Sequence, residues 1–286
     1  MKNQPLFYLF LFIILTSCQK KNSSWFCIEQ VDNKTYRIRE TKSSQGNISY
    51  LIVGDKKALL FDSGSGENQS ESMKSLVDSL AGVPIILLHS HFHFDHMGNS
   101  NDFSSIALPN LPALSSLLDS NMVLPLSEKM TLDTTKTSLK IAKILPLNAS
   151  VDLGNREIQI QHTAGHSPYS FCIIDKDRKY LFAGDLVYKG LLRINQLNDY
   201  QNSLSQLIKT CDSTYQILSA HGEENLMYSD LDKIKQALIK FQNKRPEARK
   251  KIDFLGVKKK MYVIDGIPFI YELSKDYLNE SLLIGS

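Results

Sequence analysis

The stretch that decides the fold reads Val83-Pro84-Ile85-Ile86-Leu87-Leu88-His89-Ser90-His91-Phe92-His93-Phe94-Asp95-His96. The apolar run from 83 to 88 predicts a short buried strand, and the polar residues begin where that strand ends. In an extended chain, residues two apart point to the same side, so His91 and His93 can bind one metal ion. Asp95 and His96 follow where we expect the chain to turn into a helix. There they can face a second metal ion.

A cluster of this kind has an ordinary alternative, which is a solvated polar loop with a few core histidines. One histidine alone would favour that alternative. Four histidines and an aspartate within eight residues favour a metal site instead, because imidazole and carboxylate are the ligands that zinc prefers. Phe92 and Phe94 alternate with these residues, and we expect them to pack into the core beneath.

Outward from this stretch, strands and helices alternate in two similar halves. Each half begins with antiparallel hairpins and continues with helix–strand pieces, which predicts two sheets packed together with helices outside. Residues 105–150 are weakly patterned, and we expect an insertion there that lies over the site. The expected strands are 48–53, 58–61, 83–88, 106–108, 151–163 (a hairpin turning at 154–155), 170–174, 179–183, 217–218 and a hairpin over 261–273. The expected helices are 70–80, 113–118, 200–211 and 231–241.

The pattern His91-x-His93-x-Asp95-His96 resembles the signature of the metallo-β-lactamase superfamily. The resemblance covers residues 45–225 and implies the α/β fold of that family, a four-layer αββα sandwich. The other family motifs occur in the family's order as Asp62-Ser63-Gly64, Ala164-Gly165-His166-Ser167-Pro168, Phe182-Ala183-Gly184-Asp185 and Ser219-Ala220-His221-Gly222.

The same resemblance implies a site for two Zn²⁺ ions, with Fe or Mn as alternatives. The first metal is expected on His91, His93 and His166, and the second on Asp95, His96 and His221, with Asp185 as the bridge between them. A hydroxide held between two such metals attacks a carbonyl or phosphoryl centre. Asp95 is the expected catalytic residue that orients the hydroxide and passes a proton to the leaving group.

Tyr188 is a second candidate catalytic residue. It lies three residues after Asp185, where quorum-signal lactonases of the superfamily carry a tyrosine that steadies the substrate carbonyl. A phenol hydroxyl near the metals can act as an oxyanion donor, and a tyrosine that only packs in the loop is the equal alternative. Lys189 and Arg193 are candidates for contacts to an anionic substrate. His89 and His162 are not expected to bind metal.

The resemblance also favours particular branches of the superfamily. True β-lactamases lack the bridging aspartate that Asp185 supplies, whereas thioesterases and lactonases have it. Glyoxalase II relatives carry a C-terminal helical domain, but residues 229–286 predict only one helix, a basic stretch and a hairpin. We therefore expect a zinc-dependent hydrolase of a small ester, lactone or thioester.

Three other functions stay open at this point. A single-iron sulfur dioxygenase of the same fold leaves the second metal site empty, and the complete second ligand set here argues against it. A nuclease is suggested by the basic stretch Lys244–Lys260, yet such runs are more often solvated surface, and a net charge of +3 does not argue for nucleic acid. The third is a non-catalytic metal-binding lipoprotein.

The N-terminus resembles an export signal. Lys2 precedes the apolar run Leu6–Leu15, which is too short to span a bilayer but suits a signal peptide. Leu15-Thr16-Ser17-Cys18 resembles a bacterial lipobox, in which Cys18 becomes the lipidated N-terminus; a plain secretory signal or an uncleaved anchor is the alternative. We expect a signal peptide over 1–17, a tether over 18–30, a catalytic domain over 31–286 and a membrane-anchored lipoprotein of the cell envelope, on the periplasmic face or the cell surface.

Lipidation of Cys18 would leave three cysteines, so a complete disulfide framework within the chain is excluded. Cys172 lies in an apolar strand-like run and is expected in the core. Cys27 and Cys211 can pair in an oxidising compartment, although nothing in their spacing requires it.

Overall fold

The computed structural model describes residues 24–68, 70–126, 138–148, 150–222, 226–254 and 257–271. The predicted signal peptide and Cys18 lie outside these residues. The predicted tether is too long, because residues 26–30 form most of strand β1 (Phe26–Asp32), which pairs antiparallel with β2 (Thr35–Glu40). None of the described helices has the length and apolar character that crossing a membrane requires.

The first sheet has eight strands in the order β1-β2-β3-β4-β5-β6-β8-β7. Its first four strands are antiparallel, and β4, β5, β6 and β8 run parallel to one another. The further strands of this sheet are β3 (Ile48–Val53), β4 (Ala58–Phe61), β5 (Ile85–Leu88), β6 (Ile106–Pro109), β7 (Val123–Pro125) and β8 (Ser138–Leu145).

The second sheet has six strands in the order β15-β14-β12-β11-β10-β9, and a third has four in the order β13-β18-β17-β16. The second comprises β9 (Ser150–Asp152), β10 (Glu157–His162), β11 (Phe171–Asp175), β12 (Tyr180–Gly184), β14 (Gln216–Ser219) and β15 (Leu226–Met227). The third comprises β13 (Leu192–Ile194), β16 (Lys250–Phe254), β17 (Val257–Ile264) and β18 (Ile267–Tyr271).

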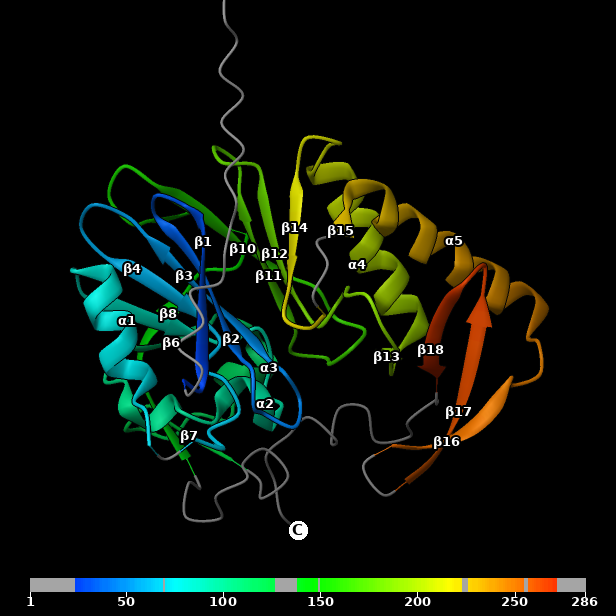
Figure 1. Cartoon of the computed structure of the whole chain (residues 1–286), viewed down its shortest axis with the longest axis horizontal. Coiled ribbons are helices and arrows are strands. Elements are labelled where there is room, and N and C mark those ends of the chain that lie inside the picture. The colour runs from blue at the N-terminus through cyan, green and yellow to red at the C-terminus, as the bar shows by residue number, and fades with distance from the viewer. Residues whose placement is uncertain are drawn as a thin grey trace, which may run out of the picture.

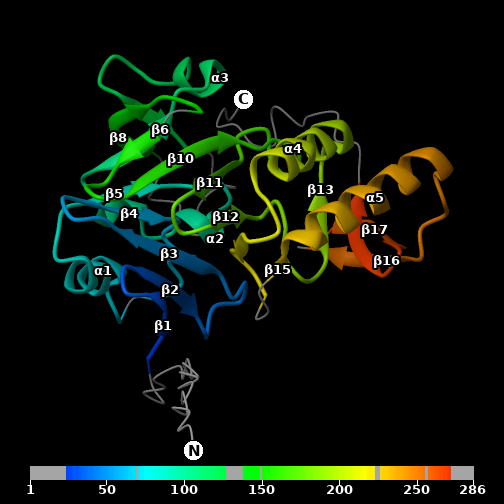
Figure 2. The same ribbon diagram turned by 90° about the horizontal axis from the view of Figure 1, so that it is seen from above.

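The two large sheets lie face to face, with helices on their outer faces (Figure 1). Helix α1 (Met73–Ala81) covers the first sheet, while α4 (Leu197–Thr210) and α5 (Tyr228–Lys244) cover the second. The short helices are α2 (Phe94–Met97), α3 (Pro112–Ser115) and the 3₁₀ turn η1 (Ser100–Asp102). This arrangement confirms the predicted αββα sandwich, to which the third sheet is added beside α5 (Figure 2).

Strand β11 shows how the sequence builds these layers. All five of its residues are buried, because one face meets the other sheet and the opposite face meets the helices. Phe171 and Ile173 belong to the core between the sheets, and Cys172 and Ile174 to the core under α4 and α5. The period-two alternation of a strand thus supplies both cores from one apolar run.

The weakly patterned residues 105–150 hold more regular structure than predicted. Strand β8 lies within them and pairs with β6 and β7, although its polar residues hide the strand pattern. The basic stretch 244–260 likewise contains β16 and part of β17, which pair antiparallel. In both cases backbone pairing with a distant or neighbouring strand, and not local hydrophobic alternation, fixes the conformation.

A buried arginine ties the two large sheets together at the end opposite to the histidine stretch. The Arg156 Nε donates to Asp175 Oδ2 at 2.8 Å within the second sheet. Its terminal nitrogens donate to the Lys34 and Val53 carbonyls and to Thr35 Oγ1 in the first sheet, at 2.8 to 3.2 Å. The charged pair is almost fully buried, so each partner depends on the other for its neutralisation.

Replacing Arg156 by Met should therefore lower the free energy of unfolding by about 3–5 kcal/mol, because Asp175 is left buried and unpaired. Urea unfolding monitored by circular dichroism measures this loss. Lys34→Met provides the control, since its partner Asp55 is exposed and surface pairs contribute at most about 1 kcal/mol. Equal losses of unfolding free energy in the two variants would contradict the role of Arg156 in tying the two sheets together.

Candidate metal centre

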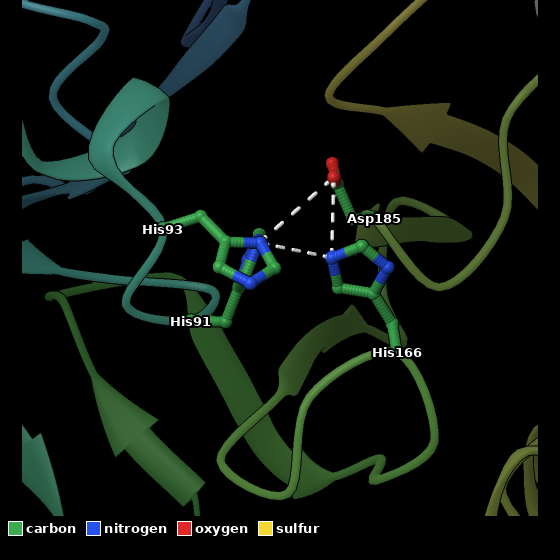
Figure 3. Close-up of side chains that lie close together, drawn as sticks. All are labelled: His91, His93, His166 and Asp185. Atoms are coloured by element: carbon green, nitrogen blue, oxygen red, sulfur yellow. Dashed lines mark hydrogen bonds and ion pairs between the residues drawn. The ribbon is translucent and has the colours of Figure 1, made fainter. Parts of the chain in front are cut away.

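Four side chains from three separate loops form the first ligand group. His91 and His93 follow β5, His166 lies in the loop after β10, and Asp185 follows β12. Their ligand atoms all lie within 4.8 Å of one another. Figure 3 shows the three imidazole rings and the carboxylate pointing at a common centre.

The distances within this group are short. His93 Nδ1 lies 2.7 Å from His91 Nε2 and 3.1 Å from His166 Nε2. Asp185 Oδ2 lies 3.5 Å from His166 Nε2 and 3.9 Å from His91 Nε2. Three ring nitrogens and one carboxylate oxygen that converge in this way are a donor set suited to a divalent cation.

Asp95, His96 and His221 form the second group. Asp95 Oδ2 lies 3.5 Å from His96 Nε2 and 3.4 Å from His221 Nε2. Asp95 and His96 belong to the short helix α2, as predicted from their position after the histidine alternation, and His221 follows β14.

Asp185 joins the two groups through its two carboxylate oxygens. While Oδ2 faces His91 and His166, Oδ1 lies 3.3 Å from His96 Nε2 and 3.1 Å from His221 Nε2. The structure thus brings all seven predicted ligands together and places Asp185 between the groups.

The fold fixes the rings of three histidines through their second nitrogens. His166 Nδ1 donates to the Arg193 carbonyl at 3.1 Å, which leaves the Nε2 lone pair directed at the centre. His96 Nδ1 lies 2.8 Å from Asp62 Oδ2, and His91 Nδ1 lies 2.9 Å from Ser90 Oγ. Such partners set the tautomer that a metal needs.

Asp62 and Gly184 show what these orientations require of the backbone. Asp62 has a φ of 70°, and its Oδ1 accepts a hydrogen bond from the Ser90 amide at 2.6 Å. Gly184 has a φ of 51°, and a Cβ there would lie 2.7 Å from the Cβ of Ser90. Only glycine lets the end of β12 approach the histidine stretch this closely.

Gly98 occupies another close approach. A Cβ on it would lie about 2 Å from the carbonyl carbon of Ser65, so the loop after Asp62 packs directly on the end of α2. The next residue is Asn99, whose Nδ2 donates to the Ser63 carbonyl at 2.6 Å. This hydrogen bond also joins the loop after Asp62 to the end of α2.

Burial and charge divide the histidines electrostatically. Burial lowers the pKa of His91 and His93 well below the usual value, and that of His166 to about 4. Burial also opposes protonation of His96 and His221. The negative charges of Asp95 and Asp185 outweigh this effect at His96, and the charge of Asp185 outweighs it at His221. The pKa of His96 is raised well above its usual value and that of His221 to about 10. Without a cation, the carboxylates of the second group therefore favour the protonated form of its two imidazoles.

The donor set fits a pair of divalent cations. The first group presents imidazoles that burial keeps neutral, which is the form that binds metal. Asp185 Oδ1 is buried, and its contacts to the ring nitrogens of His96 and His221 do not have hydrogen-bond geometry. A cation at each group would satisfy these atoms, because it would neutralise the carboxylates and accept the converging lone pairs.

A sequence model described as the metallo-beta-lactamase superfamily matches residues 46–213. The chain belongs to that superfamily. The human acyl-coenzyme A thioesterase MBLAC2 is 27% identical over 218 residues, which cover 66% of this chain and 77% of the relative. The probable metallo-hydrolase YqgX of Bacillus subtilis is 21% identical over 192 residues, which cover 64% of this chain and 89% of the relative.

Solved structures show the same superfamily fold. A metallo-beta-lactamase from Pontibacter korlensis aligns with a TM-score of 0.60 at 15% identity, over 75% of this chain and 99% of the other. The archaeal superfamily protein ST1585 from Sulfolobus tokodaii aligns with a TM-score of 0.53 at 17% identity, over 77% and 90%.

The structure places Tyr188 against a ligand of the second group. Its ring packs edge-on to His221, with centroids 5.4 Å apart, and its hydroxyl donates to the Leu191 carbonyl at 2.7 Å. Because the single hydroxyl proton is used within the loop, this arrangement favours the packing interpretation. The oxyanion role stays a prediction, which the Tyr188→Phe variant tests.

The other histidines and the cysteines lie outside the two ligand groups. His89 Nε2 lies 2.8 Å from Ser100 Oγ, and His162 Nε2 donates to the Pro168 carbonyl at 2.7 Å, so both have structural partners. Cys172 and Cys211 are buried free thiols. The pairing of Cys27 with Cys211 is therefore not formed in this structure.

Sequence reasoning missed the supporting residues around His96. Asn47 Nδ2 lies 3.3 Å from His96 Nδ1, and Asp62 was recognised only as part of a motif. No spacing rule links residues 47, 62 and 96. The positive φ of Asp62 and its burial depend on the fold. The Asp-x-Gly motif is a feature of the sequence that points to this residue.

Asp62→Asn should weaken metal binding at the second group about 10-fold to 100-fold. The amide can donate to His96 Nδ1 and so favour the tautomer that places a proton on Nε2. Zinc titration against a chromogenic chelator resolves the two affinities. Asp78→Asn on the exposed face of α1 is the control. An unchanged zinc affinity of the second group in Asp62→Asn would contradict the role of Asp62 in orienting His96.

Proposed function

We propose that the chain is a dinuclear zinc hydrolase that cleaves a small thioester, ester or lactone, with thioesters preferred. The observation that carries the proposal is the placement of the two Asp185 oxygens, one toward each ligand group. The named activity of the thioesterase relative supports a thioester over the other two substrates.

Bound at these groups, two divalent cations supply an activated water at neutral pH and polarise the substrate carbonyl. Iron or manganese is an alternative to zinc for the same ligands. His91, His93 and His166 would hold the first cation, Asp95, His96 and His221 the second, and Asp185 both.

Asp95 is the residue of this set best suited to proton transfer. Burial raises its pKa, but the neighbouring His96 and His221 more than offset that effect, so the carboxylate stays ionised. An ionised carboxylate at the edge of the centre can orient the attacking water and carry its proton to the leaving group. A thiolate leaving group needs little protonation, which suits a weakly basic acceptor.

The complete second group favours hydrolysis over the single-iron oxygenase, which would leave that group unused. The basic stretch that suggested a nuclease lies on β16 and β17 of the third sheet, whereas every metal ligand follows a strand of the two large sheets. A non-catalytic role gives no reason for the bridging position of Asp185.

The resemblance of the N-terminus to an export signal suggests where the enzyme works. The resemblance of residues 15–18 to a lipobox supports a lipoprotein anchored through Cys18 in a bacterial cell envelope, facing the periplasm or the cell surface. We expect Cys18→Ser to move the protein from the membrane fraction to the soluble fraction. Continued lipidation of that variant would refute the anchor.

Asp95→Ala should abolish hydrolysis of an acyl thioester panel while the thermal unfolding midpoint stays close to that of the parent. The control is Asp102→Ala, which removes an exposed carboxylate seven residues further on and should keep full activity. Full turnover by Asp95→Ala would contradict the assigned role. A parent enzyme that contains both metals and cleaves no thioester, ester or lactone would contradict the function.

A further inference from the structure

A cavity of about 340 Å³ lies where the end of α5 meets the third sheet. Three aromatic side chains line it, which are Phe241 of α5, Tyr262 of β17 and Tyr271 of the neighbouring strand β18. The other lining residues are Arg245, Pro246, Glu247, Ala248 and Lys260. These elements follow residues 46–213, which match the superfamily model, and none of the seven metal ligands lies in them. The cavity therefore shares no residue with the metal centre.

Arg245 extends its guanidinium over the aromatic rings of this cavity. The guanidinium carbon lies 5.7 Å from the centre of the Phe241 ring and 5.9 Å from that of Tyr271. Contacts of this kind hold the cationic group in place. Within the described residues the guanidinium forms no hydrogen bond or ion pair, so its N–H groups can donate to a ligand.

The backbone at Arg245 indicates that this side chain has a function of its own. The residue ends α5 in the left-handed conformation, with a φ of 43°. Glycine is the usual residue at such a position, because it adopts a positive φ without strain. A cation here interacts favourably with the helix dipole, but Lys244 in the last turn already supplies one. The arginine side chain therefore needs a further explanation.

Two lysines add positive charge beside the cavity. Lys260 lines it, and Lys251 stands directly opposite Lys260 in the β16–β17 pair. Like charges in opposed positions destabilise a sheet. Lysine on an edge strand such as β16 has an ordinary explanation, because it prevents pairing with other chains. That explanation does not apply to Lys260, since β17 is paired on both sides.

The described residues do not balance the charge of this cavity. No ion pair among them includes Arg245, Lys251 or Lys260, although Glu247 lines the same cavity. A phosphate monoester carries close to two negative charges at neutral pH and offers three strong acceptor oxygens. Such a group matches three neighbouring cations. The tyrosine rings beside them suit a flat or apolar group attached to the phosphate.

We propose that this cavity binds a phosphate monoester that carries a flat or apolar group, as in a nucleotide or in phosphatidic acid. Arg245 and Lys260 bind the phosphate, with Lys251 beside them, and Tyr262 and Tyr271 contact the attached group. This inference goes beyond the proposed hydrolysis and does not depend on it.

The first test is calorimetry with AMP on the zinc-loaded protein. Arg245→Gly removes the side chain and relieves the positive φ, so its free energy of unfolding should stay close to that of the parent. Its affinity for AMP should fall about 10-fold to 100-fold, because charge-assisted hydrogen bonds are lost. Lys260→Gln should lower the affinity in the same way. Lys233→Gln removes an exposed charge elsewhere on α5 and should leave the affinity unchanged.

A second test uses phosphatidylcholine vesicles with and without phosphatidic acid. Sedimentation that depends on phosphatidic acid, and that Arg245→Gly loses, would assign the site to a lipid headgroup if AMP does not bind. Binding of AMP without this sedimentation would assign it to a soluble phosphate ester.

Asp185→Ala separates the cavity from the metal centre, where a phosphate can also bind. AMP binding in the cavity should persist in this variant, because the substitution changes only the carboxylate shared by the two ligand groups.

Three results would overturn the proposal. The first is a parent protein that binds neither AMP nor vesicles containing phosphatidic acid. The second is binding that Arg245→Gly and Lys260→Gln both leave unchanged. The third is AMP binding that disappears in Asp185→Ala, which would place the phosphate at the metal centre.

Discussion

The rest of the structure depends on one buried carboxylate shared between two clusters of histidines. Asp185 directs one oxygen to His91 and His166 and the other to His96 and His221. Burial alone would raise its pKa, but His221 and His96 hold it well below the usual value. A carboxylate in this position is stable only if cations or protonated imidazoles surround it. The same constraint gathers the seven ligands and defines the chemistry that they can support.

The packing of the two large sheets brings distant strand ends to this carboxylate. Asp62 follows β4 and the histidine stretch follows β5, both in the first sheet, whereas Asp185 and His221 follow β12 and β14 in the second. The Phe171 amide donates to the Ser90 carbonyl at 2.7 Å, and the Ile48 amide to the Ala220 carbonyl at 2.8 Å. These bonds lock the sheets beside the centre, so the precision of the ligands comes from rigid elements.

The sequence predicted the parts of this arrangement that have local patterns. The alternation His91-x-His93 at a strand end follows from period-two spacing, and the strands β3, β4, β11 and β12 follow from short apolar runs bounded by turn residues. The helix expected at Asp95 begins one residue earlier, at Phe94. Strands β1, β8 and β16 were missed because polar residues interrupt their apolar positions, and pairing with neighbouring strands fixes their conformation. The contacts of Asn47 and Tyr188 depend on side-chain directions across long loops, which no spacing rule determines.

The most direct test is anomalous diffraction at the zinc edge from crystals of the chain grown without chelator. The account predicts two peaks about 3.5–4 Å apart, one beside each Asp185 oxygen. In Asp185→Ala the two metal positions would no longer share a ligand. A single peak on the three histidines of the first group, with the second group filled only by water, would contradict the dinuclear centre and with it the proposed hydrolase.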